Sequence, residues 1–406
     1  MESKNAVIIY SWSSLWSMKN KSGAPSFYKT IKLYVDKGWD VFLVLTDASN
    51  GGSNIVDDEH VFVLPKQKSD GWISPKNSTK IFLLWKMARY YMYSKKVTKK
   101  IMANGSPNIL FYAYEVHGVS AAKWASKKYH KPLITRFQGT VATYFKDNLL
   151  TRIKQYFCIK ALKTQADLVI MTDDGTKGLE TLRKLGNPSE KICFWRNGLD
   201  LLSQNYYFDE QSKEELRKAI GITKDETMLL TVSRLQDWKR VDRAIDALAK
   251  VVETDTKFKL VIAGDGPEKD NLVALAKEKN VEKNVIFLGA VPHDKVYDYM
   301  SCTDIFLSLY DMSNVGNPLL EALTLGKCII TLDVGDTNKV IHNKKNGFIL
   351  GVKELDQLPD LILKIAKDKE LKMQIENQAK CYANQEFYTW EKRMEMEYQE
   401  VCTLLK

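Results

Sequence analysis

Residues 228–252 read MLLTVSRLQDWKRVDRAIDALAKVV, and they contain the clearest local pattern of the chain. Met228–Val232 is a short run of apolar and β-branched residues without a polar face, which is typical of a central strand in a parallel sheet. A polar loop follows, and residues 241–252 then show the apolar spacing of a helix. A strand, a loop and a helix in this order are the repeating unit of a doubly wound α/β sheet.

The same unit recurs along most of the chain. The predicted strands of the first half are Ala6–Tyr10, Val41–Leu45, Val61–Leu64, Ile109–Tyr112, Leu133–Phe137 and Leu168–Thr172. Those of the second half are Met228–Val232, Lys259–Ala263, Val285–Leu288, Asp304–Ser308, Cys328–Leu332 and Gly347–Leu350. Because the spacing leaves room for a helix between most of them, the sequence predicts two Rossmann-like doubly wound domains.

The domain boundaries follow from turn signals and from length. A chain of 406 residues is too long for one ordinary core. Asn197-Gly198-Leu199-Asp200 is a turn signal, and a polar stretch follows it as far as Ile222. We therefore predict an N-terminal domain over 1–198, a C-terminal domain over 199–388, and a final helix over 389–406 that packs back toward the first domain. Ligands of open parallel sheets bind outside the carboxyl ends of the strands, so the two domains are expected to face each other across a cleft.

Composition excludes several classes of protein. Hydrophobic residues make up 45% of the chain and charged residues 27%, which is globular rather than disordered or fibrous. No apolar run approaches the roughly 18 residues of a membrane span, and the first residues resemble neither a secretory signal nor an anchor. The six cysteines are scattered without close pairs, which argues against a zinc site and against a disulfide framework. We expect a cytoplasmic protein, with a peripheral position on the inner face of the membrane as a further possibility.

Positive charge is concentrated in the first half. Residues 1–200 contain 31 Lys and Arg against 16 Asp and Glu, whereas the rest contains 29 against 34. This asymmetry indicates an anionic partner, either membrane or nucleic acid. Two stretches, Lys80–Ile101 and Tyr144–Lys163, interleave aromatic and basic residues. They fit segments that lie on anionic lipid, and they fit equally well two ordinary domain helices with solvated basic faces.

Two basic residues stand on the loop after the strand that ends at Val232. Arg234 and Lys239 lie in SRLQDWKR, between that strand and the next helix. A guanidinium fork and an ammonium at the start of a helix can neutralise a diphosphate without a metal ion. The alternative is that both are solvated loop charges, which is the commoner situation for such residues.

The segment from Tyr310 to Leu323 carries the most specific pattern, YDMSNVGNPLLEAL. Asn317 can cap a helix, Pro318 suits its first turn and Gly326 can end it. The backbone donors from Val315 to Leu319 would then point into the cleft, where phosphates and sugar hydroxyls need them. Glu321 could accept both hydroxyls of a ribose. Its alternative role is to complement the helix dipole, but a carboxylate on an otherwise apolar helix is costly without a partner.

These motifs resemble retaining glycosyltransferase family 4, which has the GT-B fold, and the resemblance runs over nearly the whole chain. The matching segments are Ser22-Gly23-Ala24, Asn197-Gly198-Leu199-Asp200, Ser233-Arg234-Leu235 with Lys239, Gly264-Asp265-Gly266-Pro267, Val285–Gly289, and Gly316-Asn317-Pro318-Leu319-Leu320-Glu321-Ala322. The family implies transfer of a sugar from a nucleotide diphosphate with retention at the anomeric carbon. It implies no cofactor and no obligatory metal.

The resemblance also assigns roles to residues. Arg234 and Lys239 would hold the diphosphate, Glu321 the ribose, and Gly23 would approach the phosphates from the first domain. The remaining predicted donor-binding residues are Ser313, Val315, Gly316, Asn317, Pro318 and Leu319. The acceptor would be a glycan, and a lipid-linked sugar of a surface polysaccharide or glycolipid if the two basic stretches bind membrane.

Three positions depart from the family pattern. A glutamate usually stands eight residues before the one matched by Glu321, and this chain has Ser313 there, with Asp311 as the nearest acid. Where a histidine often precedes a glycine, the chain has Gln138, which can hydrogen-bond a sugar hydroxyl but cannot shuttle a proton. After Val334-Gly335, where glutamate is common, Asp336 stands instead. We take Arg234, Lys239, Gln138 and Asp311 as the candidate catalytic residues.

Rival functions make different predictions. A nucleotide-dependent oxidoreductase would carry a Gly-x-Gly-x-x-Gly turn after a strand, and the sequence has none. Nucleic-acid binding is suggested by the basic first half, but no standard recognition motif accompanies it, so no nucleic-acid partner is expected. A catalytically inactive homologue that acts as a binding or assembly partner remains the alternative, because the sugar half of the site is altered. His117 also follows a strand, and a packed or loop histidine explains it best.

Overall fold

The computed structural model describes residues 4–12, 25–46, 55–65, 80–103, 108–146, 148–200 and 206–405. The chain divides into two compact units. The first comprises Met1–Asp173, Gly178–Arg196 and Glu391–Lys406, and the second comprises Asp174–Lys177 and Asn197–Trp390. The sequence placed the divisions at 198 and 388 and did not separate Asp174–Lys177 from the first domain. Backbone hydrogen bonds from Val315 N to Asp174 O (3.2 Å) and from Asp336 N to Gly175 O (3.0 Å) hold that short segment in the second unit.

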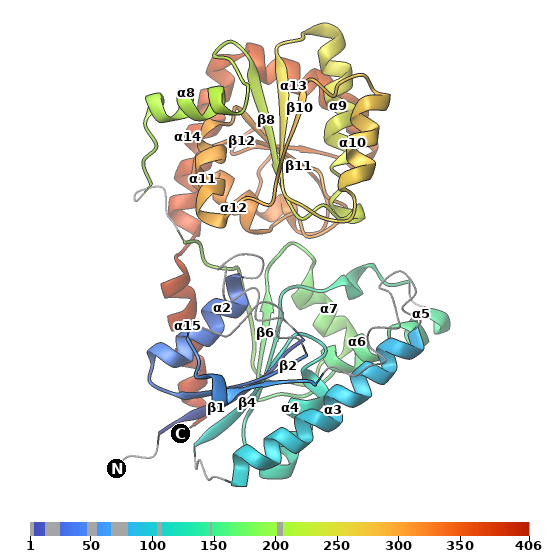
Figure 1. Cartoon of the computed structure of the whole chain (residues 1–406), viewed down its shortest axis with the longest axis vertical. Coiled ribbons are helices and arrows are strands. Elements are labelled where there is room, and N and C mark those ends of the chain that lie inside the picture. Colours follow the sequence, from blue (N-terminus) through green and yellow to red (C-terminus); the bar gives the residue numbers. More distant parts are fainter. Residues whose placement is uncertain are drawn as a thin grey trace. The chain divides into compact units, whose positions relative to one another are not determined.

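The first unit contains a seven-stranded parallel sheet in the order β3-β2-β1-β4-β5-β6-β7 (Figure 1). Its strands are β1 (Ala6–Tyr10), β2 (Asp40–Leu45), β3 (Val61–Val63), β4 (Ile109–Tyr114), β5 (Leu133–Phe137), β6 (Leu168–Thr172) and β7 (Ile192–Trp195). Strand β7 was not among the predicted strands. This strand has four residues, stands at the edge of the sheet and is only half-buried, so it lacks the long apolar run that marks a central strand.

Helices cover both faces of this sheet. They are α2 (Pro25–Asp36), α3 (Lys80–Ala103), α4 (Val119–Tyr129), α5 (Leu149–Lys154), α6 (Tyr156–Leu162), α7 (Gly178–Leu185) and α15 (Trp390–Thr403), with short 3-10 turns η1 (Asp58–His60) and η4 (Val141–Tyr144). Alternate strand residues such as Ile8 and Phe111 pack under α3, α4, α6 and α7. On the other face Tyr112 contacts Tyr34 of α2 and bonds to Glu397 of α15.

The terminal helix α15 is fixed to the first sheet by a buried charged network. The Glu397 carboxylate accepts from Arg136 Nη1 of β5 and from Arg393 Nη1, each at 3.1 Å, and from the Tyr112 hydroxyl at 2.7 Å. All three charged side chains are almost completely shielded from solvent. A buried carboxylate is tolerated only when its partners are complete, so Glu397 fixes the register of α15 on the sheet.

The second unit contains a six-stranded parallel sheet in the order β10-β9-β8-β11-β12-β13. Its strands are β8 (Thr227–Val232), β9 (Phe258–Ala263), β10 (Val285–Gly289), β11 (Ile305–Ser308), β12 (Cys328–Leu332) and β13 (Phe348–Leu350). Its helices are α8 (Glu210–Ala219), α9 (Asp242–Thr254), α10 (Lys269–Glu278), α11 (His293–Cys302), α12 (Asn317–Thr324), α13 (Leu358–Lys367) and α14 (Lys369–Glu386), with 3-10 turns η5 (Asp237–Lys239), η6 (Thr337–Lys339) and η7 (Val352–Gln357). One face packs against α9, α10 and α13 and the other against α11 and α12, while α14 contributes to both cores (Figure 1).

The longest helix of the first unit, α3, does not have the composition of a membrane span. It carries six lysines and one arginine between Lys80 and Lys100. Among the described residues, no helix combines the length and the hydropathy that a bilayer crossing requires.

Candidate active site

Three loops of the second unit meet at one edge of its sheet. They follow β9, β8 and β11, which are neighbours and run parallel, so their carboxyl ends lie together. The loops are tied to one another by hydrogen bonds. The Tyr310 hydroxyl donates to Val232 O at 2.8 Å, and Asp311 N donates to Trp238 O at 3.0 Å. This edge is where the sequence placed most of the candidate residues.

The glycine turn after β9 supports the loop that carries Arg234. Gly264 has φ +149°, and a Cβ there would overlap the Ser233 carbonyl oxygen. A Cβ on Gly266 would likewise overlap the carbonyl oxygen of Leu235, whose amide donates to Asp265 O at 3.0 Å. The two loops are therefore packed backbone to backbone, which only glycine permits. The Gly-Asp-Gly-Pro motif acts here by shaping the neighbouring loop.

Lys239 occupies an unusual environment. Its ammonium lies 3.8 Å from the centroid of the Tyr310 ring and 4.2 Å from that of Trp238. Burial lowers the pKa of Lys239 to about 7, and the charge of Asp174 opposes this only in part. Within the described part of the chain, no carboxylate forms an ion pair with this ammonium. A desolvated cation held against two aromatic rings gains strongly from an anionic ligand.

Arg234 lies exposed on the same loop, before η5. Among the described residues its guanidinium has no ion-pair partner. Arg234 and Lys239 thus place two basic side chains at the carboxyl end of β8, and neither forms an ion pair with the described residues. In the described ranges, no three His, Cys, Asp or Glu side chains lie together as a metal site would require.

The start of α12 adds backbone and side-chain donors. The helix runs from Asn317 to Thr324 behind Gly316, with Pro318 in its first turn as predicted. The amides of Gly316 and Asn317 have no acceptor within the described residues. The side-chain oxygen of Asn317 accepts from Asn197 Nδ2 at 3.2 Å, while its own Nδ2 is buried without a partner. Because an unpaired buried donor is costly, this cluster is arranged for an acceptor from outside the chain. Val315 and Leu319, also predicted here, are buried and donate their amides to Asp174 O and Gly316 O.

Glu321 is buried beside a histidine. The residue is 2% exposed, and its Oε1 lies 2.9 Å from Nε2 of His293, at the start of α11. The other ring nitrogen of His293 lies 3.7 Å from the Asp200 carboxylate. The sequence analysis predicted Glu321 as a buried functional carboxylate and missed His293. The position of His293 in the sequence could have indicated it. His293 begins a helix just after β10, so it lies at the same edge of the sheet as the other loops.

Two carboxylates belong to the surroundings of Ser313: Asp311, which was predicted, and Asp174, which was not. Asp311 binds Arg243 Nη2 at 2.6 Å and lies 3.5 Å from Arg240 Nη1. Ser313 has φ +56°, and its hydroxyl donates to Asp174 Oδ2 at 2.8 Å. Asp174 therefore places a carboxylate beside Ser313, and it was not predicted because it lies far away in the chain.

The predicted residues of the first unit are described separately. Gln138 follows β5. Its backbone amide donates to Glu115 Oε1 at 2.7 Å, and its side-chain Nε2 is buried without a partner among the described residues. His117 stacks on Trp12 with centroids 4.2 Å apart and planes 16° apart, and burial with the charge of Lys86 lowers its pKa. Gly23 lies outside the described residues.

Comparison with known proteins identifies the class and then the family. A crystal structure of Anabaena Alr3699/HepE in complex with UDP-glucose has a TM-score of 0.73 at 19% identity, and the match covers 97% of this chain and 99% of that one. Two Rossmann-like units with helices on both faces of each sheet are the GT-B fold, as predicted. Residues 212–381 match the family model "Glycosyl transferases group 1", which confirms the resemblance to group 1 glycosyltransferases read from the motifs.

Two curated relatives match part of the chain. N-acetyl-alpha-D-glucosaminyl L-malate synthase of Bacillus anthracis is 31% identical over 188 residues, which are 46% of this chain and 48% of that protein. Alpha-monoglucosyldiacylglycerol synthase of Streptococcus pneumoniae is 31% identical over 138 residues, which are 34% of this chain and 31% of that protein. The matched regions thus span about half and about a third of these relatives.

Proposed function

We propose that this chain is a retaining glycosyltransferase that takes a sugar from a nucleotide diphosphate and transfers it to a lipid-linked or surface-polysaccharide acceptor. The observation that carries the proposal is Lys239, a desolvated ammonium without a carboxylate partner among the described residues, at the edge of the sheet where nucleotides bind. The structures of Anabaena Alr3699/HepE with UDP and with UDP-glucose support a nucleotide sugar as the donor.

The proposed chemistry needs no metal ion and no cofactor. Negative charge develops on the diphosphate as the bond between its oxygen and the anomeric carbon breaks. Arg234, Lys239 and the amides at the start of α12 would stabilise that charge, since fixed donors aimed at a developing anion lower the barrier directly. The acceptor hydroxyl forms the new bond to the anomeric carbon, and its proton passes to the departing diphosphate. In the first unit, Gln138 is the residue we assign to a sugar hydroxyl, because its side-chain amide lacks a partner.

Glu321 is assigned to the ribose, and this assignment predicts a specific loss. Its buried carboxylate can accept from both ribose hydroxyls. Replacing Glu321 with Gln should weaken UDP binding roughly tenfold to a hundredfold, because a charge-assisted hydrogen bond is worth about 1.5–3 kcal/mol. Calorimetric titration with UDP and with 2′,3′-dideoxy-UDP measures the effect. The parent should prefer UDP, and the variant should bind both equally. An undiminished preference for UDP in the variant would remove Glu321 from the ribose site.

Asp174 is assigned to the sugar half of the site. Its carboxylate accepts from Ser313, the position where the family has a glutamate, whereas Asp311 is engaged by Arg243 and Arg240. We predict that Asp174→Asn lowers kcat for UDP release from UDP-glucose at least 100-fold while UDP affinity changes less than threefold. Adding Ser313→Glu to that variant should raise kcat at least tenfold, because it places a carboxylate where the family has its glutamate.

The matched control is Asp173→Asn. Asp173 precedes Asp174 in the chain but pairs with Arg196 at 3.3 Å in the first unit. This variant should keep the parent's kcat. Equal losses in the two variants, or no rescue by glutamate at position 313, would show that Asp174 has only a structural role.

The acceptor assignment rests on the exposed surface of the first unit. Leu84, Trp85 and Met92 of α3 are between 37% and 62% exposed, on a helix that carries seven basic residues. Apolar and basic side chains on one helix are the composition of segments that lie on anionic membranes. The diacylglycerol product named in the Streptococcus pneumoniae relative supports a lipid acceptor.

Release of nucleoside diphosphate tests the proposed function. The protein is incubated with UDP-, GDP-, ADP- and dTDP-sugars in the presence of a lipid extract from cells that carry the protein, and each product is separated and its anomeric configuration read by NMR. The proposal expects one donor to be consumed and its anomeric configuration to be kept. The second candidate, an inactive homologue, is favoured by the absence of the family's glutamate at Ser313. It expects nucleotide binding without turnover, and an inverted product would contradict the retaining mechanism.

A further inference from the structure

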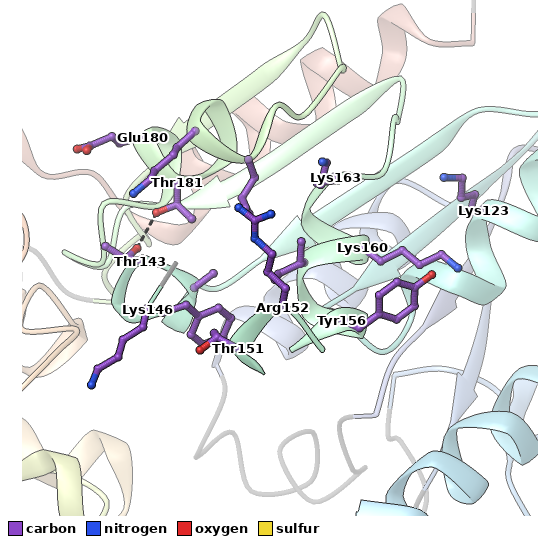
Figure 2. A pocket seen from close by; sticks show the side chains of 15 residues that line it. Lys123, Thr143, Lys146, Thr151, Arg152, Tyr156, Lys160, Lys163, Glu180 and Thr181 are labelled. Atoms are coloured by element: carbon purple, nitrogen blue, oxygen red, sulfur yellow. Dashed lines mark hydrogen bonds between the residues drawn. The ribbon is translucent and has the colours of Figure 1, made fainter. Parts of the chain in front are cut away.

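The first unit contains a basic pocket that the proposed donor chemistry does not use. It has a volume of about 650 Å³ and is lined by residues of η4, α5, α6 and α7, with one lysine from α4 (Figure 2). Its basic lining residues are Lys123, Lys146, Arg152, Lys160, Lys163 and Lys184. Among the described residues that line the pocket, Glu180 is the one acidic side chain. We call this feature the basic pocket.

Several lysines of the basic pocket lie close to one another. Burial lowers the pKa of Lys123, and the charges of Lys127 and Lys160 lower it further. In the described ranges, Lys160 and Lys163 form no ion pair, and the ammonium of Lys160 lies 5.3 Å from the centroid of the Tyr156 ring. In Figure 2, Thr181 lies on the left of the pocket and Lys123 on the right. The side chains of Arg152 and Lys163 lie between them. Such a concentration of like charge favours an anionic ligand.

Hydroxyl groups complete the lining. Thr143 of η4 and Thr181 of α7 form a hydrogen bond of 2.7 Å on one wall of the pocket (Figure 2). Thr151 of α5 is a third lining hydroxyl. Hydroxyls and cations together form the donor set that phosphate oxygens accept. The volume is in the range of small-molecule sites and suits a phosphate or diphosphate with an attached sugar.

An exposed apolar strip begins on the helix that supplies Thr151 and Arg152. Leu149, Leu150 and Ile153 of α5 are 74%, 60% and 66% exposed. Tyr156 and Phe157 of α6 continue the strip, at 52% and 43%. Large apolar side chains gathered at this exposure mark a surface that meets lipid or protein. The adjoining positive charge favours lipid with an anionic headgroup.

We propose that the basic pocket binds the phosphate or diphosphate group of a membrane lipid whose chains lie against the apolar strip. The inference deepens the proposed function and rests on it in one respect, that this lipid is the acceptor. The lipid source, rather than free phosphate, is favoured because the apolar strip would otherwise remain in water. A pocket without the strip would suit a soluble anion equally well.

Vesicle binding and pyrophosphate binding test the proposal together. Binding is measured to phosphatidylcholine vesicles with and without phosphatidylglycerol, and to inorganic pyrophosphate in solution. The pocket variant is Lys160→Glu with Lys163→Glu. The control is Lys250→Glu with Lys277→Glu, which reverses two exposed lysines on α9 and α10 of the second unit and changes the net charge equally. The strip variant is Leu149→Ser with Ile153→Ser.

The expected results separate the two parts of the site. The pocket variant should lose at least tenfold in affinity for the anionic vesicles relative to the control, because each basic residue near an anionic surface contributes about 1 kcal/mol. With the diphosphate site of the second unit saturated by the nucleoside diphosphate that binds there, it should also lose pyrophosphate binding. The strip variant should lose vesicle binding and keep pyrophosphate binding.

Three results would overturn the proposal. They are equal losses in the pocket variant and the control, an unaffected strip variant, or a pocket variant that binds vesicles normally but has lost binding to a single-stranded RNA oligonucleotide. All changed residues are exposed, and Lys160→Ala with Lys163→Ala serves as a second, milder pocket variant. The thermal shift with UDP, GDP, ADP, dTDP and CDP, read on the same samples, reports the second unit. Failure of the proposed function therefore appears as a parent that none of the five stabilises, independently of the vesicle result.

Discussion

Replacing Lys239 with methionine is expected to weaken binding of the donor at least 100-fold. The ammonium is held against Tyr310 and Trp238 with no carboxylate partner in the described part of the chain, so its charge is available to a diphosphate. A hundredfold loss corresponds to about 2.7 kcal/mol, the size expected for a desolvated ion pair with one partner removed. Calorimetric titration with UDP-glucose measures it. Met keeps most of the packing against the two rings, so the loss reports the charge.

The same substitution should stabilise the protein without ligand. The folded pKa of Lys239, about 7, is below its ordinary value of 10.5, so folding disfavours the charged form. The resulting destabilisation is complete below pH 7 and disappears as the pH rises toward 10.5, because the unfolded chain holds the extra proton over that window. Thermal melts at pH 6.5 and pH 9.5 should show a higher melting temperature for the variant than for the parent. The difference should be larger at pH 6.5. A variant that melts below the parent at pH 6.5 would mean that the ammonium is already neutralised.

Donor affinity should also depend on pH through Lys239. Only the protonated lysine attracts a diphosphate, and its pKa in the free protein is about 7. Affinity for UDP-glucose, whose phosphates do not titrate near neutrality, should therefore fall roughly tenfold for each pH unit above 7 until the pKa of the bound state is reached. Lys239→Met should lack this dependence. A parent whose affinity is flat from pH 6 to pH 9 would contradict the assignment.

Glu397→Gln should destabilise the first unit by about 3–5 kcal/mol. The change leaves Arg136 and Arg393 buried with their charges and without the carboxylate that they share, and breaking a buried ion pair from one side has this cost. The hydrogen bond from Tyr112 is weakened as well. Hydrogen exchange read by mass spectrometry on peptides of β4, β5 and α15 reports the opening of this unit by itself.

Glu395→Gln on the same helix is the matched control. Its carboxylate pairs with Lys37 at 2.9 Å, but the side chains of Glu395 and Lys37 are 42% and 35% exposed. An exposed ion pair contributes about 0–1 kcal/mol, so this variant should resemble the parent. If both variants lost the same small amount, the buried network would not be what fixes α15 on the sheet.

The strands and the division into two α/β units could be predicted from sequence because buried parallel strands leave a strong signal. Runs such as Ile8 to Tyr10 and Leu260 to Ala263 are apolar without interruption, which few other structures require. The edge strand β7 has no such run and was missed. The return of the chain to the first unit was predicted from Trp390–Lys406, a helix with no strand after it, and α15 does belong to that unit.

Candidate site residues could be predicted from sequence where they lie on a single loop that follows a strand. Arg234, Lys239 and the start of α12 lie on loops that directly follow strands, so position in the sequence fixes position on the sheet. His293 and Asp174 were missed for a different reason. Their contacts with Glu321 and Ser313 join residues 28 and 139 positions apart, and no local pattern encodes such pairs. The burial that lowers the pKa of Lys239 is likewise a property of packing, because Trp238 is adjacent in sequence but Tyr310 is not.

Binding of nucleoside diphosphates tests the central claim most directly. The melting temperature of the full chain is measured with UDP, GDP, ADP, dTDP and CDP, and again with Arg234→Ala and Lys239→Met. We predict that one nucleoside diphosphate stabilises the parent by several degrees and that each substitution removes the shift. A parent that none of the five stabilises would contradict the claim that the second unit binds a nucleotide diphosphate sugar.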